Sequence, residues 1–135
     1  MRHRVAGRKL SRTTAHRRAL SRNLMLGLLT EFGRKGFIVT TREKAKFVQP
    51  HVEKLISMAR TKTLAKVRRA ISLLQSRELV KKLFDEIGPY YARRPGGYTR
   101  VVRLARRRLG DNASQAYLGF VQDEKPAAAV PATVE

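Results

Sequence analysis

Basic residues along this chain are separated from acidic ones, and this separation limits what the chain can fold into. Eight lysines and arginines precede the first acid, Glu31, and seven arginines with no acid lie between Pro89 and Asp111. Like charges crowded in this way repel one another and cannot be buried without partners. The sequence therefore predicts a folded body with two acid-free surfaces that face a polyanion. The alternative is a basic face that is merely solvated, but solubilising cations are usually interspersed with acids.

The composition is that of a folded domain with a very basic surface. The 135 residues include 30 lysines and arginines against 10 acids, which gives a formal net charge of +20, and 42% of the residues are hydrophobic. That apolar fraction is ordinary for a globular protein, so a core can form, and the length suits one domain with tails. A net charge this large favours binding to surfaces that carry phosphates.

Cysteine content and hydropathy argue against a disulfide-stabilised or membrane-spanning protein. The chain has no cysteine, so disulfides and thiolate metal sites are impossible, which fits a reducing compartment. No apolar run approaches the roughly 18–20 residues needed to span a bilayer. Residues 1–23 lack the apolar stretch of a secretory signal, although their arginine and Ser/Thr content without acids is also typical of organelle transit peptides.

Hydrophobic periodicity predicts a first helix with a strongly basic beginning. Its apolar stripe repeats every four residues and consists of Leu20, Leu24, Leu28 and Phe32. Thr13 or Thr14 is the expected N-cap, and Gly33 is the expected stop. Arg17 and Arg18 lie in the first turns, where the helix dipole disfavours cations, so we expect an anionic partner to compensate them.

Three further helices are expected. A second helix begins after Thr41, and Pro50 within it should kink or divide it. A third covers residues 64–75, and a fourth starts after Ser76 and stops at Gly88–Pro89. The predicted buried face of the second helix consists of Ala45, Val48, Val52, Leu55, Ile56 and Ala59.

Three segments are predicted as strands, over residues 37–40, 98–106 and 116–122. Gly110-Asp111-Asn112 is a turn signal between the last two, which should therefore pair. The expected fold class is α+β, with a small mixed sheet of about three strands packed with four helices. We expect residues 1–12 to form an extended basic arm, 13–122 a single domain, and 123–135 a disordered Ala/Pro-rich tail.

The residues that could carry catalysis are not arranged for it. His3, His16 and His51 are far apart in sequence, and none has metal-ligand spacing with another. Asp85 and Glu86 are adjacent on a predicted helix and so point in different directions. We therefore expect no enzyme activity, no metal and no cofactor.

Nucleic-acid binding fits the same residues better. Arginine exceeds lysine, and its guanidinium can grip phosphate oxygens with paired hydrogen bonds and stack on bases. Tyr90, Tyr91 and Tyr98 lie among arginines and offer rings for unpaired bases, although each could equally be a core or sheet residue. Gly96 and Gly97 would let the backbone approach a sugar-phosphate chain closely, and a tight turn without a ligand is the alternative.

Short motifs along residues 1–122 carry a resemblance to a known family. They are Met1-Arg2-His3-Arg4, Gly7-Arg8, Leu10, Arg12, His16-Arg17, Ala19, Arg22-Asn23, Thr40-Thr41, Lys44-Ala45-Lys46, Gly96-Gly97-Tyr98-Thr99-Arg100, Gly110-Asp111-Asn112-Ala113 and Ala116-Tyr117. In this order they closely resemble the bacterial large-subunit ribosomal protein seventeen family, and together they are highly specific. Pro50 and the tail after Gln122 depart from the family pattern.

The resemblance implies a component of the large ribosomal subunit that binds large-subunit ribosomal RNA on the solvent side, near the exit of the peptide tunnel. It implies a small mixed sheet with helices packed on it, neighbouring large-subunit proteins as partners, and a cytoplasmic, ribosome-associated location. It also weakens the transit-peptide interpretation.

By position in the family, the arginine-rich opening and the Gly96–Arg100 loop contact the RNA. With the arginines of the second acid-free segment, the expected RNA-binding residues are Arg2, His3, Arg4, Arg8, Lys9, Arg12, His16, Arg17, Arg18, Arg22, Arg93, Arg94, Gly96, Gly97, Tyr98, Arg100, Arg106, Arg107 and Arg108.

Two rival hypotheses belong to other classes. A free-standing nucleic-acid-binding protein would show a helix-turn-helix or a heptad dimer seam, and neither is evident. A membrane-surface protein would need a basic amphipathic helix with aromatic anchors, which is missing.

Overall fold

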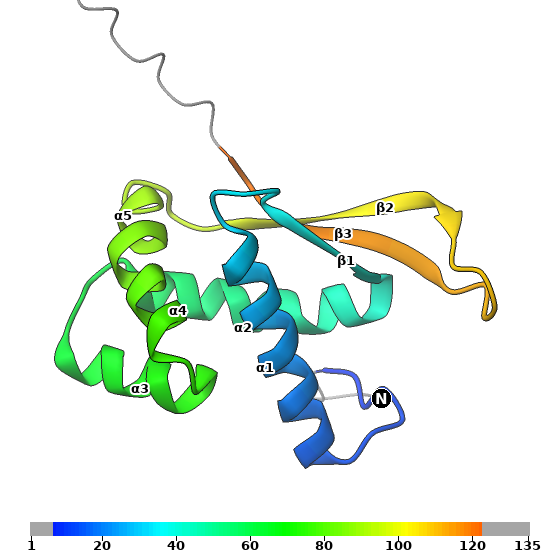
Figure 1. Cartoon of the computed structure of the whole chain (residues 1–135), viewed down its shortest axis with the longest axis horizontal. Coiled ribbons are helices and arrows are strands. Elements are labelled where there is room, and N and C mark those ends of the chain that lie inside the picture. Colours follow the sequence, from blue (N-terminus) through cyan, green and yellow to red (C-terminus); the bar gives the residue numbers. More distant parts are fainter. Residues whose placement is uncertain (1–6, 123–135) are drawn as a thin grey trace, which may run out of the picture.

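A three-stranded sheet and a set of helices packed on one of its faces make up the fold (Figure 1). The structure, a computed structural model, describes residues 7–122. The elements are α1 (Thr14–Glu31), β1 (Phe37–Thr41), α2 (Arg42–Ala59), α3 (Leu64–Leu74), α4 (Arg77–Lys82), a π-helical turn η1 (Leu83–Ile87), α5 (Gly88–Tyr90), β2 (Thr99–Arg107) and β3 (Ser114–Phe120). The predicted tail over 123–135 and the first half of the predicted arm lie outside the described residues.

The sheet is antiparallel throughout, in the order β1-β3-β2. The α+β class is confirmed, but the expectation of a mixed sheet was wrong. The short turn at Gly110 forces β2 and β3 to run in opposite directions, and β1 pairs antiparallel with the free edge of β3. Leu118 faces the helices and is fully buried, whereas Val39 and Val102 on the opposite face are about half exposed.

Helix α2 lies across the sheet, and its buried face is the one predicted. Each of its six buried residues is at most 3% exposed. Pro50 does not divide the helix, which is continuous from Arg42 to Ala59. Because Pro50 itself is exposed, its ring and the backbone hydrogen bond it removes lie on the solvent side, and the packed face holds the helix together.

The predicted stop at Gly88–Pro89 was also wrong, because α4, η1 and α5 run on as one helical stretch to Tyr90. At this point the bonding changes from α to π, and the Gly88 N–H donates to the Leu83 carbonyl. Proline has no N–H, so a turn that widens just before Pro89 accommodates it. Gly88 is buried against the backbone of Ala59 at the end of α2.

Helix α1 is half in the core and half outside it. Thr13 is its N-cap, as predicted, and accepts a hydrogen bond from the His16 N–H. The fully buried positions are Leu28 and Leu29, near the C-terminal end, whereas the predicted stripe residue Leu20 is only half-buried. The first turns of α1 therefore extend past the core.

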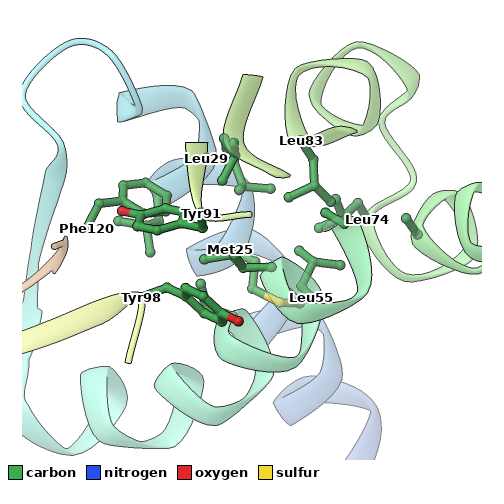
Figure 2. Packing of buried hydrophobic residues seen from close by; sticks show 14 of the residues in the cluster. Met25, Leu29, Leu55, Leu74, Leu83, Tyr91, Tyr98 and Phe120 are labelled. Atoms are coloured by element: carbon green, nitrogen blue, oxygen red, sulfur yellow. The ribbon is translucent and has the colours of Figure 1, made fainter. Parts of the chain in front are cut away.

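Aromatic side chains close the core beneath the sheet (Figure 2). Tyr91 and Tyr98 are buried, with ring centroids 5.2 Å apart, and Tyr91 stacks on Phe120 at 6.4 Å. The Tyr91 hydroxyl donates to the Val121 carbonyl over 2.7 Å. Neither buried ring can stack on a base, so the expectation that Tyr91 and Tyr98 serve as stacking surfaces was wrong; the core alternative holds.

The contact between Gly88 and Ala59 gives a test of this packing. A Cβ at position 88 would lie 2.4 Å from the Ala59 carbonyl oxygen, which is backbone and cannot rotate away. We expect Gly88→Ala to lower the free energy of unfolding by about 1–3 kcal/mol. Gly27→Ala is the matched control, because nothing lies within 4 Å of a Cβ there and alanine favours the helix by about 0.5–1 kcal/mol. Urea unfolding of both variants measures the difference, and equal stability would contradict the packing.

Candidate nucleic-acid interface

One basic surface surrounds a hollow where the first half of α1 extends beyond the core. Its volume is about 800 Å³. We call it the α1 hollow; it is lined by Gly7, Arg8, Lys9, Thr14, Arg17, Arg18, Ser21, Arg22, Met25, Phe47, His51, Ser72 and Leu73. Five of the lining residues are cations and none is an acid. The hollow therefore joins an apolar floor to a cationic rim.

Helical spacing explains why the rim is basic. Arg18, Arg22 and Met25 follow one another on the same face of α1, which continues into the core at Leu29. This inward face thus changes from arginine to apolar residues as the helix enters the core. Arg22 is oriented by a hydrogen bond of 3.0 Å from its Nε to the carbonyl of Leu73, at the end of α3.

The residues before α1 are held against the start of α2. The Arg8 guanidinium pairs with the Glu43 carboxylate, which also accepts from Arg42 Nε over 2.8 Å. Arg17 donates from Nη1 to the carbonyl of Arg12 over 2.6 Å, which closes the turn before the helix. The described part of the predicted arm, residues 7–12, is therefore tied to the body at two places.

A second basic surface lies along the hairpin of β2 and β3, which projects from the body (Figure 1). Arg100, Arg103, Arg106 and Arg107 are exposed along β2. The pairing of β2 with β3 is irregular between Arg103 and Arg107, as expected for a β-bulge. A bulge bends the strand and changes the direction in which its side chains point, so these arginines reach outward on more than one side.

Two polar residues of α2 hold the start of this hairpin. The Glu53 carboxylate accepts from the Tyr98 N–H over 3.1 Å, from the Thr99 N–H over 2.7 Å and from the Thr99 hydroxyl over 2.5 Å. Gln49 Nε2 donates to the Thr99 carbonyl over 3.2 Å. We call these contacts the Thr99 clamp. The clamp anchors the beginning of β2 to α2 and so positions the hairpin arginines.

The tip of the hairpin is closed by an ion pair. Arg108 Nε donates to Asp111 Oδ1 over 2.9 Å, and the same oxygen accepts from the Ala113 N–H over 3.2 Å. The hydrogen bond from Arg108, helped by the Ala113 N–H, lowers the pKa of the Asp111 carboxyl to about 2. Arg108 is therefore the one predicted contact residue in the hairpin whose charge is already paired within the described chain.

The structure separates the arginines of the second acid-free segment, which lie close together in the sequence. The loop with Arg93, Arg94, Gly96 and Gly97 is held at the C-terminal end of α2, where Arg60, the residue after the helix, donates from Nη2 to the Ala92 carbonyl over 2.8 Å. The hairpin tip lies at the other end of β2, whose nine residues span roughly 30 Å. The loop and the tip therefore lie at opposite ends of β2.

The remaining predicted residues fall into three groups. Arg2, His3 and Arg4 lie outside the described residues. His16 is exposed at the start of α1, and Arg12 is half-buried. Residues that the sequence interpretation missed are Gln49, Glu53, Phe47, His51 and Arg103. Glu53 carried one signal, since it is an acid within a basic chain and lies one helical turn from Gln49.

Other kinds of site are missing from residues 7–122. That part of the chain holds no group of three or more His, Cys, Asp or Glu side chains placed to bind a metal ion. None of its helices is long and apolar enough to cross a membrane.

Comparisons with known proteins agree with the resemblance carried by the sequence motifs. Residues 20–121 match the family described as Ribosomal protein L17. The chain is 49% identical to the large ribosomal subunit protein bL17 of Nitratidesulfovibrio vulgaris, over the whole of both chains. It is 46% identical to the bL17 of Halothermothrix orenii, over 86% of this chain and 97% of that one. The bL17 of Solibacter usitatus is 49% identical over 92% of this chain and 79% of its own.

The Thr99 clamp predicts a specific effect on the hairpin. We expect Glu53→Ala to lower the free energy of unfolding by about 1–3 kcal/mol, because the N–H groups of the buried residues Tyr98 and Thr99 lose their acceptor. The amides of Tyr98 and Thr99 should also lose protection from hydrogen exchange. Glu86→Ala, at an exposed position, is the control and should change stability by less than about 0.5 kcal/mol. Unchanged exchange at Thr99 would contradict the clamp.

The hairpin tip predicts an acid-sensitive ion pair. Because the pKa of Asp111 is lowered in the folded chain, the pair stabilises the turn above the usual carboxyl pKa of 3.8 and is lost as the pH falls toward 2. NMR titration of the Asp111 side-chain carboxyl should give a midpoint near 2. In Arg108→Ala the midpoint should rise toward 3.8, since the larger cause of the shift is removed. A wild-type midpoint near 3.8 would show that the pair does not form in solution.

Proposed function

This chain belongs to the ribosomal protein L17 family, and we propose on that premise that it is a structural component of the large ribosomal subunit that binds and stabilises the subunit's RNA. One observation supports RNA as the partner. Residues 7–22 hold six cations and no acid, and residues 93–108 hold seven arginines and no acid. The fold presents both segments at the surface, where they can neutralise phosphates.

The two surfaces suit a partner that is large and folded. The α1 hollow lies beside the start of α2, because Arg8 in its lining pairs with Glu43 of that helix. The second basic surface lies along the hairpin and is as long as β2. Only a polyanion of comparable extent can contact both. Ribosomal RNA has that extent, and neighbouring large-subunit proteins are the expected second class of partner.

The dependence of RNA affinity on salt tests this function. Each phosphate contact adds about 0.7–0.9 to the slope of log K against log salt, so Arg106→Ala/Arg107→Ala should lower the slope by about 1–2. Arg68→Ala/Arg77→Ala removes two exposed arginines of α3 and α4 outside both surfaces and should leave the slope unchanged. The probe is structured large-subunit RNA, titrated at several salt concentrations.

Two outcomes would count against the proposal. Equal affinity for duplex DNA and for structured RNA would favour a general nucleic-acid-binding protein. A chain that stays at the top of a sucrose gradient, while the large subunits of the same lysate sediment, would not be a subunit component.

The location near the exit of the peptide tunnel, on the solvent side, is part of the same proposal and is supported by the family resemblance. Because the chain has no cysteine, a single introduced thiol can be labelled cleanly. Leu109 at the hairpin tip is 84% exposed, so Leu109→Cys can carry a hydroxyl-radical probe without disturbing the core. Cleavage of RNA remote from the tunnel exit in labelled subunits would reject this location.

A further inference from the structure

We propose that the α1 hollow holds one unpaired nucleotide of the bound RNA, an inference that rests on the proposed function and names the ligand of that surface. The hollow's volume of about 800 Å³ falls within the roughly 300–1,000 Å³ of small-molecule sites. Its lining also matches the two parts of a nucleotide, because the apolar residues suit the base and the cations suit the phosphate.

The floor supplies a surface for a base. Phe47 and His51 are one turn apart on α2, and their ring centroids lie 5.4 Å from each other at 49°. Met25 and Leu73 complete the apolar floor. Aromatic rings and apolar side chains of this kind stack on bases that are not paired, whereas a paired base is already covered on both faces by its neighbours.

His51 also offers a polar group to the nucleotide. Its Nδ1 lies 3.0 Å from the Phe47 carbonyl oxygen, which can only accept, so Nδ1 must carry the proton. In the neutral ring this leaves Nε2 as an acceptor. A ribose 2′-hydroxyl or a base amino group can donate to it, and the 2′-hydroxyl would favour RNA over DNA.

The rim supplies a phosphate clamp. Arg22 donates a hydrogen bond from its Nε to the Leu73 carbonyl. Neither of its terminal nitrogens has a partner among residues 7–122. A guanidinium held by a carbonyl keeps its full charge and presents a fork of donors to an anion. Arg18, exposed beside it on α1, adds a second cation.

An unpaired buried hydroxyl is the independent sign of a ligand. Ser21 is only 5% exposed, lines the hollow, and its Oγ has no hydrogen-bond partner among the described residues. Buried polar groups without a partner are rare in folded proteins. Ser21 lies one turn from Arg18 and from Met25 and lines the hollow with them, so a bound nucleotide would give the hydroxyl a partner.

A protein segment is a poorer occupant. An apolar peptide could cover Met25 and Phe47, but it would remove water from the four lining cations that have no carboxylate partner among residues 7–122, without neutralising them. A nucleotide covers the floor and neutralises the rim at once.

The test compares two RNA hairpins that differ only in one bulged nucleotide, titrated against the full chain. We expect the wild-type chain to bind the bulged hairpin about 10-fold more tightly than the fully paired one. Phe47→Leu should abolish this preference, because it removes the ring and keeps an apolar side chain. Phe37→Leu, on the opposite face of the sheet, is the matched control and should keep the preference.

A second readout follows the floor directly. The Met25 methyl resonance should shift with the bulged hairpin, through the ring current of the stacked base, and not with the paired one. Two results would overturn the proposal. One is that the wild-type chain shows no preference for the bulged hairpin, and the other is that Phe47→Leu weakens binding of both hairpins equally. The hollow would then hold water or contact a neighbouring protein. Salt-dependent binding of both hairpins would then still support the proposed function, whereas no binding to either would reject the function itself.

Discussion

Burial of one face of α2 is the interaction on which the rest of the structure depends. Helix α1, all three strands, α3, η1 and α5 pack on it, and its small or branched side chains let these elements approach closely. The same helix positions both basic surfaces. Glu43 in its first turn holds Arg8, and Glu53 in its middle holds the start of β2 at Thr99. A change in how α2 packs would therefore move the α1 hollow and the hairpin relative to each other.

Local patterns in the sequence predicted most of this fold, and the failures have physical causes. The buried face of α2, the N-cap at Thr13 and the turn at Gly110 depend on neighbouring residues, so periodicity and turn chemistry found them. The stop at Gly88–Pro89 failed because a π-helical turn and a tertiary contact with Ala59 replaced the expected break. No local pattern reports that a glycine is needed for another helix to come close.

The candidate interface was predictable in its chemistry and not in its geometry. Within the described residues, the absence of acids correctly identified two segments, 7–22 and 93–108, whose cations lie largely at the surface. Arg93 and Arg106 are close in sequence, yet β2 carries them to opposite ends of the sheet. Tyr98 stands in an arginine-rich motif, yet it is buried because the Thr99 clamp draws the start of β2 onto α2. The spacing of residues along the chain does not indicate that Glu53 accepts from the N–H groups of Tyr98 and Thr99, which lie 45 and 46 positions away.

Among residues 7–122, backbone carbonyl oxygens orient more cations than carboxylates do. Arg17 donates to the Arg12 carbonyl and Arg22 to the Leu73 carbonyl, and Lys82 donates to the Phe32 carbonyl at the end of α1. A carboxylate would orient the same groups and would also cancel their charge. A carbonyl restricts the side chain while leaving a full positive charge available to an anion. Arg17 and Arg22, two of the six cations of residues 7–22, are therefore ordered before any partner binds, which reduces the entropy lost when a polyanion arrives.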